Sequence, residues 1–321
     1  MDFTPSVYEH AAALIGRTPW EVSRDGELLF QGHAEAFRRY RHSPVVAGID
    51  IYNLEAEAYG AIVTKPEGAA VPAISIHPYA SMLEVERLPH YDPGRAGRIP
   101  LVLEAAQRIA RTFHSADVRV PLSGPFSIAC ALIGFETLLC EVASDPVRVL
   151  KALLHLAEGQ LDFCRAIRDR GLGIAFFESA AAPPLLSPDM FAAVELPALR
   201  RVVEGASEVL GQPVPCVIGG NTAPILKHLL LTGTRYVICP AETDQAAFMS
   251  SIWDRTEIRV RINMDLRVLV RGPWQAIRAE VDRVLALVRG RANVCLGTGT
   301  LPFETPPENV LQVAEYVKHQ R

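Results

Sequence analysis

From Asp145 onward, short β-rich runs alternate with long amphipathic segments, and this alternation restricts the fold of the 321-residue chain more than any other feature. The first long segment, 145–171, has Asp145 as an N-cap, Pro146 in its first turn and Gly171 as a stop, which predicts a helix. Apolar runs follow, each leading into another helical segment. Near-continuous apolar strands joined by helices are typical of a parallel sheet covered by helices.

Seven such strands are predicted along the chain. They cover residues 43–50, 117–124, 173–179, 213–220, 235–240, 257–263 and 292–300. Helices are predicted at 101–114, 145–171, 187–211, 222–233, 243–253, 273–289 and 305–321. Seven strands are one short of a (β/α)8 barrel, and 61–76 holds two candidates for the missing strand, AIVTK and VPAISI. No G-x-G-x-x-G follows an early strand, so we favour a TIM barrel over a doubly wound, dinucleotide-binding α/β sheet.

No break in composition divides the chain. We therefore expect a single TIM-barrel domain over residues 1–321, with 1–44 as a helical N-terminal extension packed on the barrel. The six cysteines include no C-x-x-C pair, and in a chain of this length they indicate buried thiols rather than a disulfide framework.

The charge pattern and the N-terminus limit the partners we expect. The formal net charge is −4, and the Lys and Arg residues are scattered, which gives no basic surface for nucleic acid. The N-terminus lacks the basic and apolar regions of a signal peptide, and no apolar run approaches the roughly 20 residues that cross a bilayer. We expect a cytoplasmic protein that binds neither nucleic acid nor membrane.

Several segments together resemble one family. PVPCVIGGNTAPIL, residues 213–226, is an apolar strand that runs into a Gly-Gly-Asn turn and a helix, and it resembles a turn of the uroporphyrinogen decarboxylase superfamily. Further segments resemble the superfamily in the same order: 48–60, 122–134, 145–154, 176–191, 261–265 and 296–310. They cover most of the chain, and the segment 48–60 is most similar to the cobalamin-linked methyltransferase branch.

The resemblance also shows which chemical groups are absent. In the methyltransferases a His and a Cys of this turn bind zinc, and Val217 and Gly219 occupy those positions here, while a late Cys falls at Thr298 or Thr300. Val and Gly cannot ligate a metal, so we expect no metal site of the usual kind. A displaced metal or thiol site stays open as an alternative to structural thiols, through three cysteines in nearby strands: Cys216, Cys239 and Cys295.

Most catalytic and substrate-binding residues of true uroporphyrinogen decarboxylases have no counterpart in this chain either. Their N-terminal Arg-Gln-Ala-Gly-Arg-Tyr segment has no counterpart, their tyrosine falls near Ala131 and their late histidine falls at Thr298. Their catalytic aspartate corresponds to Asp50 if one extra residue is allowed before Gly60. These departures argue against that reaction.

Three residues are the candidate catalytic groups. Glu178 ends the apolar run IAFFE, where a carboxyl group tends to have a raised pKa and can act as general acid or base. The alternative is a salt bridge to Arg261. Asp50 ends strand 43–50 and either faces the barrel mouth or caps the next helix. His77 closes a β-like run and could act as a base, a ligand or a substrate contact, or could be a structural loop residue.

Polar residues near other strand ends form the candidate substrate-binding set. Helix capping is the alternative role for Asn221 and the default role for Asp265. Ser123 lacks the Gly-x-Ser-x-Gly surroundings of a hydrolase nucleophile. The candidate substrate-binding residues are Tyr52, Asn53, Ser123, Asn221, Arg261, Asn263 and Thr298.

The resemblance implies methyl transfer to a small-molecule substrate, with acid-base groups in place of zinc. No corrinoid-binding Asp-x-His-x-x-Gly motif is present, so methylcobalamin would be carried by a separate corrinoid protein, and the chain itself would bind no cofactor. A homodimer is the assembly we expect. One alternative is a metal-independent decarboxylase or lyase in which Arg259 and Arg261 clamp a carboxylate. Another is a non-catalytic ligand-binding barrel.

Overall fold

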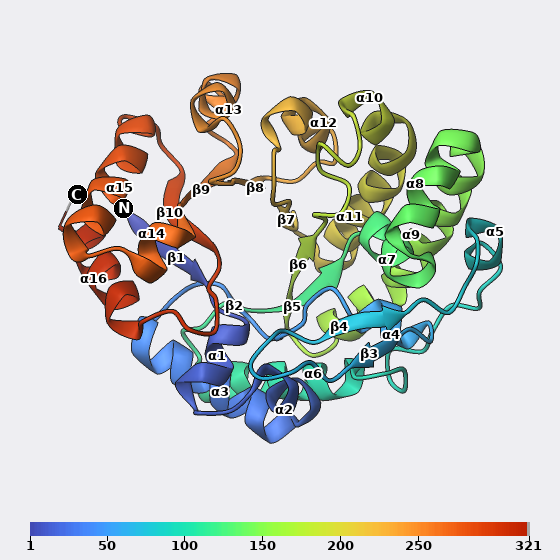
Figure 1. Cartoon of the computed structure of the whole chain (residues 1–321), viewed down its shortest axis with the longest axis horizontal. Coiled ribbons are helices and arrows are strands. Elements are labelled where there is room, and N and C mark those ends of the chain that lie inside the picture. The colour runs from blue at the N-terminus through green and yellow to red at the C-terminus, as the bar shows by residue number, and fades with distance from the viewer. Residues whose placement is uncertain (320–321) are drawn as a thin grey trace.

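Eight parallel strands form a barrel in the computed structural model, which describes residues 1–319 (Figure 1). Their hydrogen bonds make two four-stranded sheets, in the orders β1-β10-β9-β8 and β2-β5-β6-β7. The two sheets meet where β7 lies beside β8, and β1 and β2 are their other ends. The strands are β1 (Asp2–Ser6), β2 (Val45–Val46), β5 (Val118–Ser123), β6 (Gly173–Phe177), β7 (Cys216–Val217), β8 (Tyr236–Cys239), β9 (Arg259–Met264) and β10 (Val294–Thr300).

Strand β1 corrects two predictions. It pairs in parallel with β10, so the eighth strand lies within the segment 1–44 that was expected to be helical throughout. Its sequence is a weak strand signal because it is short and contains Pro5, which has no N–H to donate and lies at a break in the register. The segment 61–76 instead forms an antiparallel hairpin outside the barrel, of β3 (Ile62–Thr64) and β4 (Ala73–Ile76).

Helices surround the barrel, as the strand-helix alternation predicts. The last predicted helix, 305–321, is observed as Pro307–Lys318, and its residues 320–321 lie outside the described part of the chain. The helices are α1 (Glu9–Leu14), α2 (Pro19–Arg24), α3 (Gly26–Tyr40), α4 (Leu54–Ala58), α5 (Met82–Val85), α6 (Ile99–Thr112), α7 (Pro125–Ile133), α8 (Phe135–Ser144), α9 (Pro146–Arg168), α10 (Pro188–Met190), α11 (Leu196–Leu210), α12 (Leu226–Leu230), α13 (Gln245–Ile252), α14 (Leu266–Arg271), α15 (Trp274–Leu287) and α16 (Pro307–Lys318). A π-helical turn, Phe191–Glu195, connects α10 to α11.

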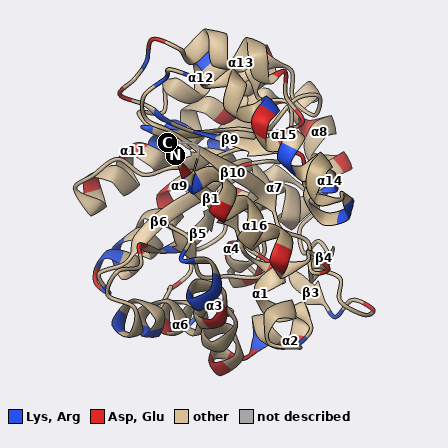
Figure 2. Ribbon diagram, turned by 90° about the vertical axis from the view of Figure 1, so that its left-hand side faces the viewer, with Lys and Arg blue, Asp and Glu red and all other residues tan. Residues whose placement is uncertain are grey.

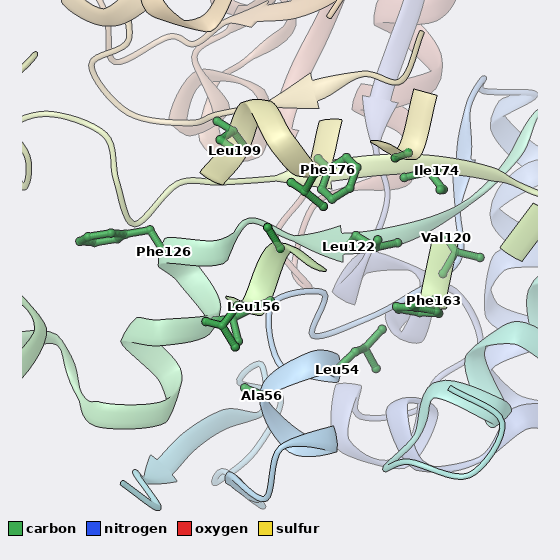
Figure 3. Close-up of a cluster of buried hydrophobic side chains, with 14 of the residues drawn as sticks. Leu54, Ala56, Val120, Leu122, Phe126, Leu156, Phe163, Ile174, Phe176 and Leu199 are labelled. Atoms are coloured by element: carbon green, nitrogen blue, oxygen red, sulfur yellow. The ribbon is translucent and has the colours of Figure 1, made fainter. Parts of the chain in front are cut away.

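Alternation along β6 shows how the core is divided. Ile174 and Phe176 point outward and pack among helix residues such as Leu156 and Leu199 (Figure 3). Each of these buried side chains stabilises the fold by about 1.5–3 kcal/mol relative to an exposed one. Phe177 points into the barrel, where it packs in a smaller cluster with strand residues of the interior. Because successive strand residues point to opposite faces, the residue after Phe177 points toward the helices.

Charged residues of both signs are interspersed over the outer elements (Figure 2). Among the described residues, no single helix is long and apolar enough to cross a membrane, and the apolar pair α7 and α8 is bent by 113°. Gly134, with φ of 83°, lies at this bend, which brings the end of α7 close to the loop that follows β4.

Candidate functional site

Two cavities lie at the end of the barrel where the parallel strands finish, which is the end at which TIM barrels carry their chemistry. The larger has a volume of about 330 Å³ and the smaller about 220 Å³, and Tyr52 and Asn53 line both. The larger is also lined by Ile74, His77, Ser127, Cys130, Ala131, Phe135, Ser179 and Ala180. The smaller is also lined by Tyr8, Glu9, Ile49, Asp50, Ile51, Val71, Pro72 and Thr300.

Tyr52 and Asn53 hold the shared wall of these cavities. The Tyr52 hydroxyl lies 2.7 Å from Ser179 Oγ, which also accepts a hydrogen bond from the backbone N–H of Gly219 (3.1 Å). Asn53 donates from Nδ2 to Asp50 Oδ2 and to the carbonyl of Pro72, each at 2.9 Å. Burial raises the pKa of Tyr52, so its hydroxyl stays protonated. Both residues were predicted from the sequence, and the structure places both at the cavities.

His77 lines the larger cavity from the loop after β4. Its Nδ1 lies 2.8 Å from the carbonyl oxygen of Ala131, which can only accept, so Nδ1 carries the proton. In the neutral ring Nε2 then keeps a free lone pair and can accept a proton. Gly134 makes room for the ring, because a Cβ there would lie 3.2 Å from the His77 Cδ2 atom. His77 thus has the geometry of a general base.

Asp50 is held by an ion pair. Arg98 donates from Nη1 to Asp50 Oδ1 (2.8 Å) and from Nη2 to Oδ2 (2.7 Å), and Arg98 also pairs with Glu57 (2.6 Å). Asp50 borders the smaller cavity but is only 5% exposed. Because both of its oxygens are occupied by a bidentate guanidinium, Asp50 fixes the loop after β2 rather than serving as a free base. The structure thus places the predicted Asp50 beside the smaller cavity, as an ion-paired residue.

Glu178 lines neither cavity. It follows inward-pointing Phe177 and therefore faces the helices, where it is fully buried. Its Oε2 accepts from the backbone N–H groups of Phe126 and Ser127 (3.1 Å each), and its Oε1 accepts from Ser127 Oγ (2.5 Å). The sequence prediction placed Glu178 in contact with substrate. In the structure Ser127, which the sequence did not single out, is the residue that joins Glu178 to the larger cavity.

The proposed salt bridge between Glu178 and Arg261 is also absent from the described residues, since the two side chains lie on opposite faces of the barrel wall. The group beside Glu178 is instead Glu195, in the π-helical turn. Both carboxyl groups are fully buried, and no donor within residues 1–319 reaches the Glu195 oxygens. Turns of this kind are frequent at functional sites.

The two glutamates share one dry environment. Burial raises the pKa of Glu178, and burial together with the charge of Glu178 holds the pKa of Glu195 well above its usual range. Two carboxyl groups in such a site retain a proton between them. Burial and the same negative charge also raise the pKa of Cys130, to about 11, so this cavity residue is a thiol rather than a thiolate.

Five of the predicted substrate-binding residues do not line the cavities, and three of these five hydrogen-bond to other parts of the protein. Ser123 is fully buried, and its Oγ donates to the carbonyl of Ile51 (3.4 Å). Thr298 Oγ1 accepts from the backbone N–H of Ser6 (3.0 Å), which ties β10 to β1. Asn221 accepts from Thr243 Oγ1 (3.0 Å) at the surface. The structure gives these residues roles in holding the barrel and its loops.

Arg261 and Asn263 point into the barrel from β9, because Val260 and Ile262 pack on its outer face. Arg261 is 6% exposed and Asn263 is 3% exposed. The Arg261 Nε and Asn263 Oδ1 atoms have no hydrogen-bond partner in the described part of the chain. Neither residue lines either cavity.

The donor set for zinc does not fit. Val217 packs in the barrel interior, and residues 1–319 hold no group of three His, Cys, Asp or Glu side chains arranged for a metal ion. Cys216 and Cys239 are buried among apolar residues on the helix side of the sheet. Burial raises the pKa of Cys239 to about 12 and that of Cys216 further, so both are protonated thiols.

Comparisons with protein families and with solved structures give matches over nearly the whole chain. The family model described as uroporphyrinogen decarboxylase (URO-D) matches residues 3–320, whereas no curated protein matches the sequence. Among solved structures, a methyltransferase from Methanosarcina mazei is similar with a TM-score of 0.81 and 22% identity, over 98% of this chain and 92% of that one. This likeness confirms the TIM barrel predicted from the sequence.

Two further solved structures are only weakly similar to this chain. KGPDC from Streptococcus mutans has a TM-score of 0.30 and 10% identity, over 67% of this chain and 93% of that one. The β-glycosidase from Thermosphaera aggregans has a TM-score of 0.44 and 10% identity, over 92% of this chain and 85% of that one. Neither bears on the site.

Proposed function

The chain belongs to the uroporphyrinogen decarboxylase family, and on this premise we propose that it is a methyltransferase-like enzyme that methylates a small acceptor without zinc. The observation that carries this proposal is His77, which lines the larger cavity with Nδ1 bound to a carbonyl and Nε2 free to take a proton. The position of the cavities at the carboxyl ends of the strands supports it.

The step assigned to the chain is activation of the acceptor. His77 Nε2 takes the proton from the acceptor X–H, X keeps the bonding electron pair, and that pair forms the new bond to the methyl carbon as the bond from the methyl group to its donor breaks. A positioned base contributes roughly 10²–10⁴-fold to such a step. Tyr52, Asn53 and Ser179 would orient the acceptor, since their polar groups border the same space.

The methyl donor belongs outside the chain. Methylcobalamin on a separate corrinoid protein would supply the methyl group, and the homodimer predicted from the sequence is the assembly in which we expect the enzyme to act. The buried pair of Glu178 and Glu195 would hold a proton behind the cavity and exchange it through Ser127 Oγ.

A second function is favoured by one observation. Arg261 is a buried cation without an anionic partner in the described residues, which suits a substrate carboxylate. In a metal-independent decarboxylase or lyase, the carboxylate would leave as carbon dioxide, its electron pair would stay on carbon, and the proton held with Glu178 would reach that carbon through Ser127.

One assay tests the first proposal against the second. Purified protein is mixed with methylcobalamin and a panel of thiol, amine and carboxylate acceptors, and loss of the methyl-corrinoid absorbance is followed. The first proposal expects acceptor-dependent loss of that absorbance. Release of carbon dioxide from a carboxylate without corrinoid demethylation would reject the first proposal and support the second.

A further inference from the structure

Three arginines are buried in the described part of the chain, and only one is without partners. Arg98, 7% exposed, is paired with Asp50 and Glu57. Arg291, also 7% exposed, donates from Nη1 and Nη2 to backbone carbonyls, among them that of Ile258 at 3.1 Å. Arg261, 6% exposed, makes no hydrogen bond or ion pair within residues 1–319.

An unpaired buried charge is costly, since the effective penalty for removing an ion from water is several kcal/mol even after relaxation. The surroundings of Arg261 offer hydroxyl groups but no carboxylate. Its charge acts on the hydroxyls of Tyr8 and Tyr236, both of which stay protonated because burial raises the pKa of each. A guanidinium kept in such a place has the chemistry of an anion-binding group.

The direction of the Arg261 side chain connects it to the site. A Cβ at Gly297 would overlap the Cγ and Cδ atoms of Arg261, so the arginine passes over this glycine. Gly297 is paired with Asn263, which lies two residues beyond Arg261 toward the carboxyl end of β9. The side chain therefore leans toward the end of the barrel that holds the cavities. Tyr8, on which the arginine acts, lines the smaller of them.

We propose that Arg261 binds the carboxylate of the substrate, at a subsite in the barrel interior that Tyr8 and Asn263 complete. The guanidinium would donate two parallel N–H bonds to the carboxylate, as such pairs commonly do, and the Tyr8 hydroxyl and the Asn263 amide would each donate one more. The inference rests on the proposed function and names its substrate class: a small organic acid that enters past Tyr8.

Charge balance favours a carboxylate over a phosphate. A single guanidinium neutralises one negative charge, whereas a phosphate dianion would leave a second charge in an interior lined by Tyr8, Phe177, Val217 and Ile238. A cavity of about 400 Å³ at the opposite end of the barrel has Arg259, Arg119 and Lys318 in its wall, but Arg261 does not line it. The structure thus separates Arg259 from Arg261, with which the sequence predicted a joint carboxylate clamp, and Arg259 serves as the control.

The experiment measures anion binding without any methyl donor. Propionate and inorganic phosphate are titrated separately, by calorimetry and thermal unfolding, against the wild-type protein and the variants Arg261→Met, Arg261→Lys and Arg259→Gln. Propionate is expected to bind the wild type and Arg259→Gln alike. We expect affinity to fall at least about tenfold in Arg261→Met, a loss of about 1.4 kcal/mol, and by less in Arg261→Lys, which keeps the charge but not the fork.

Three results would overturn the subsite. They are equal propionate binding by the wild type and Arg261→Met, loss of binding in Arg259→Gln instead, or tighter binding of phosphate than of propionate to the wild type. Arg261→Met removes an unpaired buried charge, so we expect this variant to fold. If Arg261→Met does not fold, the propionate affinity of Arg261→Lys is compared with that of the wild type instead. Because no methyl transfer is measured, failure of the subsite and failure of the proposed function are distinguishable.

Discussion

Two buried histidines next to strand β2 should each subtract from the stability of this protein as the pH falls. His33 is fully buried on α3, and its Nε2 lies 3.0 Å from the backbone nitrogen and 3.1 Å from the carbonyl oxygen of Gly48. Gly48 lies two residues before Asp50, at the start of the loop that holds the cavity wall. Burial lowers the pKa of His33 to about 4 and that of His42 to about 3, and the charge of His33 contributes to the second shift.

The size of the effect follows from proton linkage. Both histidines have folded-state pKa values below the ordinary 6.5, so their contribution to stability is complete above about pH 7.5 and is lost as the pH falls through 6.5 toward 3. At about pH 5 the unfolded histidines are almost fully protonated and the folded ones are not. Each therefore costs about 2 kcal/mol, or about 4 kcal/mol together.

His42→Leu isolates half of that effect. The two ring nitrogens of His42 have no partner in the described residues, so the substitution breaks no hydrogen bond and keeps a similar volume. The free energy of unfolding, measured by urea titration at about pH 7.5 and about pH 5, should fall with acid by about 2 kcal/mol less in the variant than in the wild type. An equal fall in both proteins would refute the linkage argument.

Other expectations follow from the site. Glu195→Gln should weaken the infrared band of protonated carboxylic acid at neutral pH, to which Glu9 and Glu55 also contribute because burial raises the pKa of each to about 7. The variant should also gain stability over the wild type as the pH rises, because a raised folded pKa costs stability at high pH; an unchanged band would contradict the shared proton. Asp50→Asn should cost about 1.5–3 kcal/mol in urea unfolding, because Arg98 loses its bidentate carboxylate and keeps Glu57; unchanged stability would contradict the contribution of the pair. Gly297→Ala should lower the melting temperature, and Arg261→Ala, which removes the Cγ and Cδ atoms, should rescue it; additive effects of the two substitutions would exclude the contact.

The barrel was predictable because its signals are local and repeated. Capped helices that alternate with apolar strands, as in 145–179, specify a parallel sheet regardless of the sequences of the connecting loops. Strand β1 was missed because five residues with Pro5 carry almost no strand signal, and only pairing with β10 stabilises them. The hairpin of β3 and β4 does have strand-forming residues, and these predict a strand correctly. They do not specify which sheet the strand joins, so the sequence does not distinguish a hairpin from a barrel strand.

The site was harder to predict because strand-end position does not decide which way a side chain points. Glu178 ends its strand as predicted, but Phe177 before it points inward, so the carboxyl group faces α7. Counting alternate residues along IAFFES would have favoured Ser179 as the cavity residue. Nothing local to Asp50 indicates that Arg98, far along the chain, will occupy its oxygens.

Whether His77 is the base that activates a methyl acceptor can be measured directly. Methylcobalamin demethylation is compared in the wild type, His77→Asn and His114→Asn, in which the control histidine is exposed and lines neither cavity. In His77→Asn the amide that replaces the ring can still donate to the Ala131 carbonyl, but it offers no basic nitrogen to the cavity. We therefore predict a rate loss of about 100-fold or more in His77→Asn, with His114→Asn unchanged. Equal rates in all three proteins would contradict the proposed mechanism.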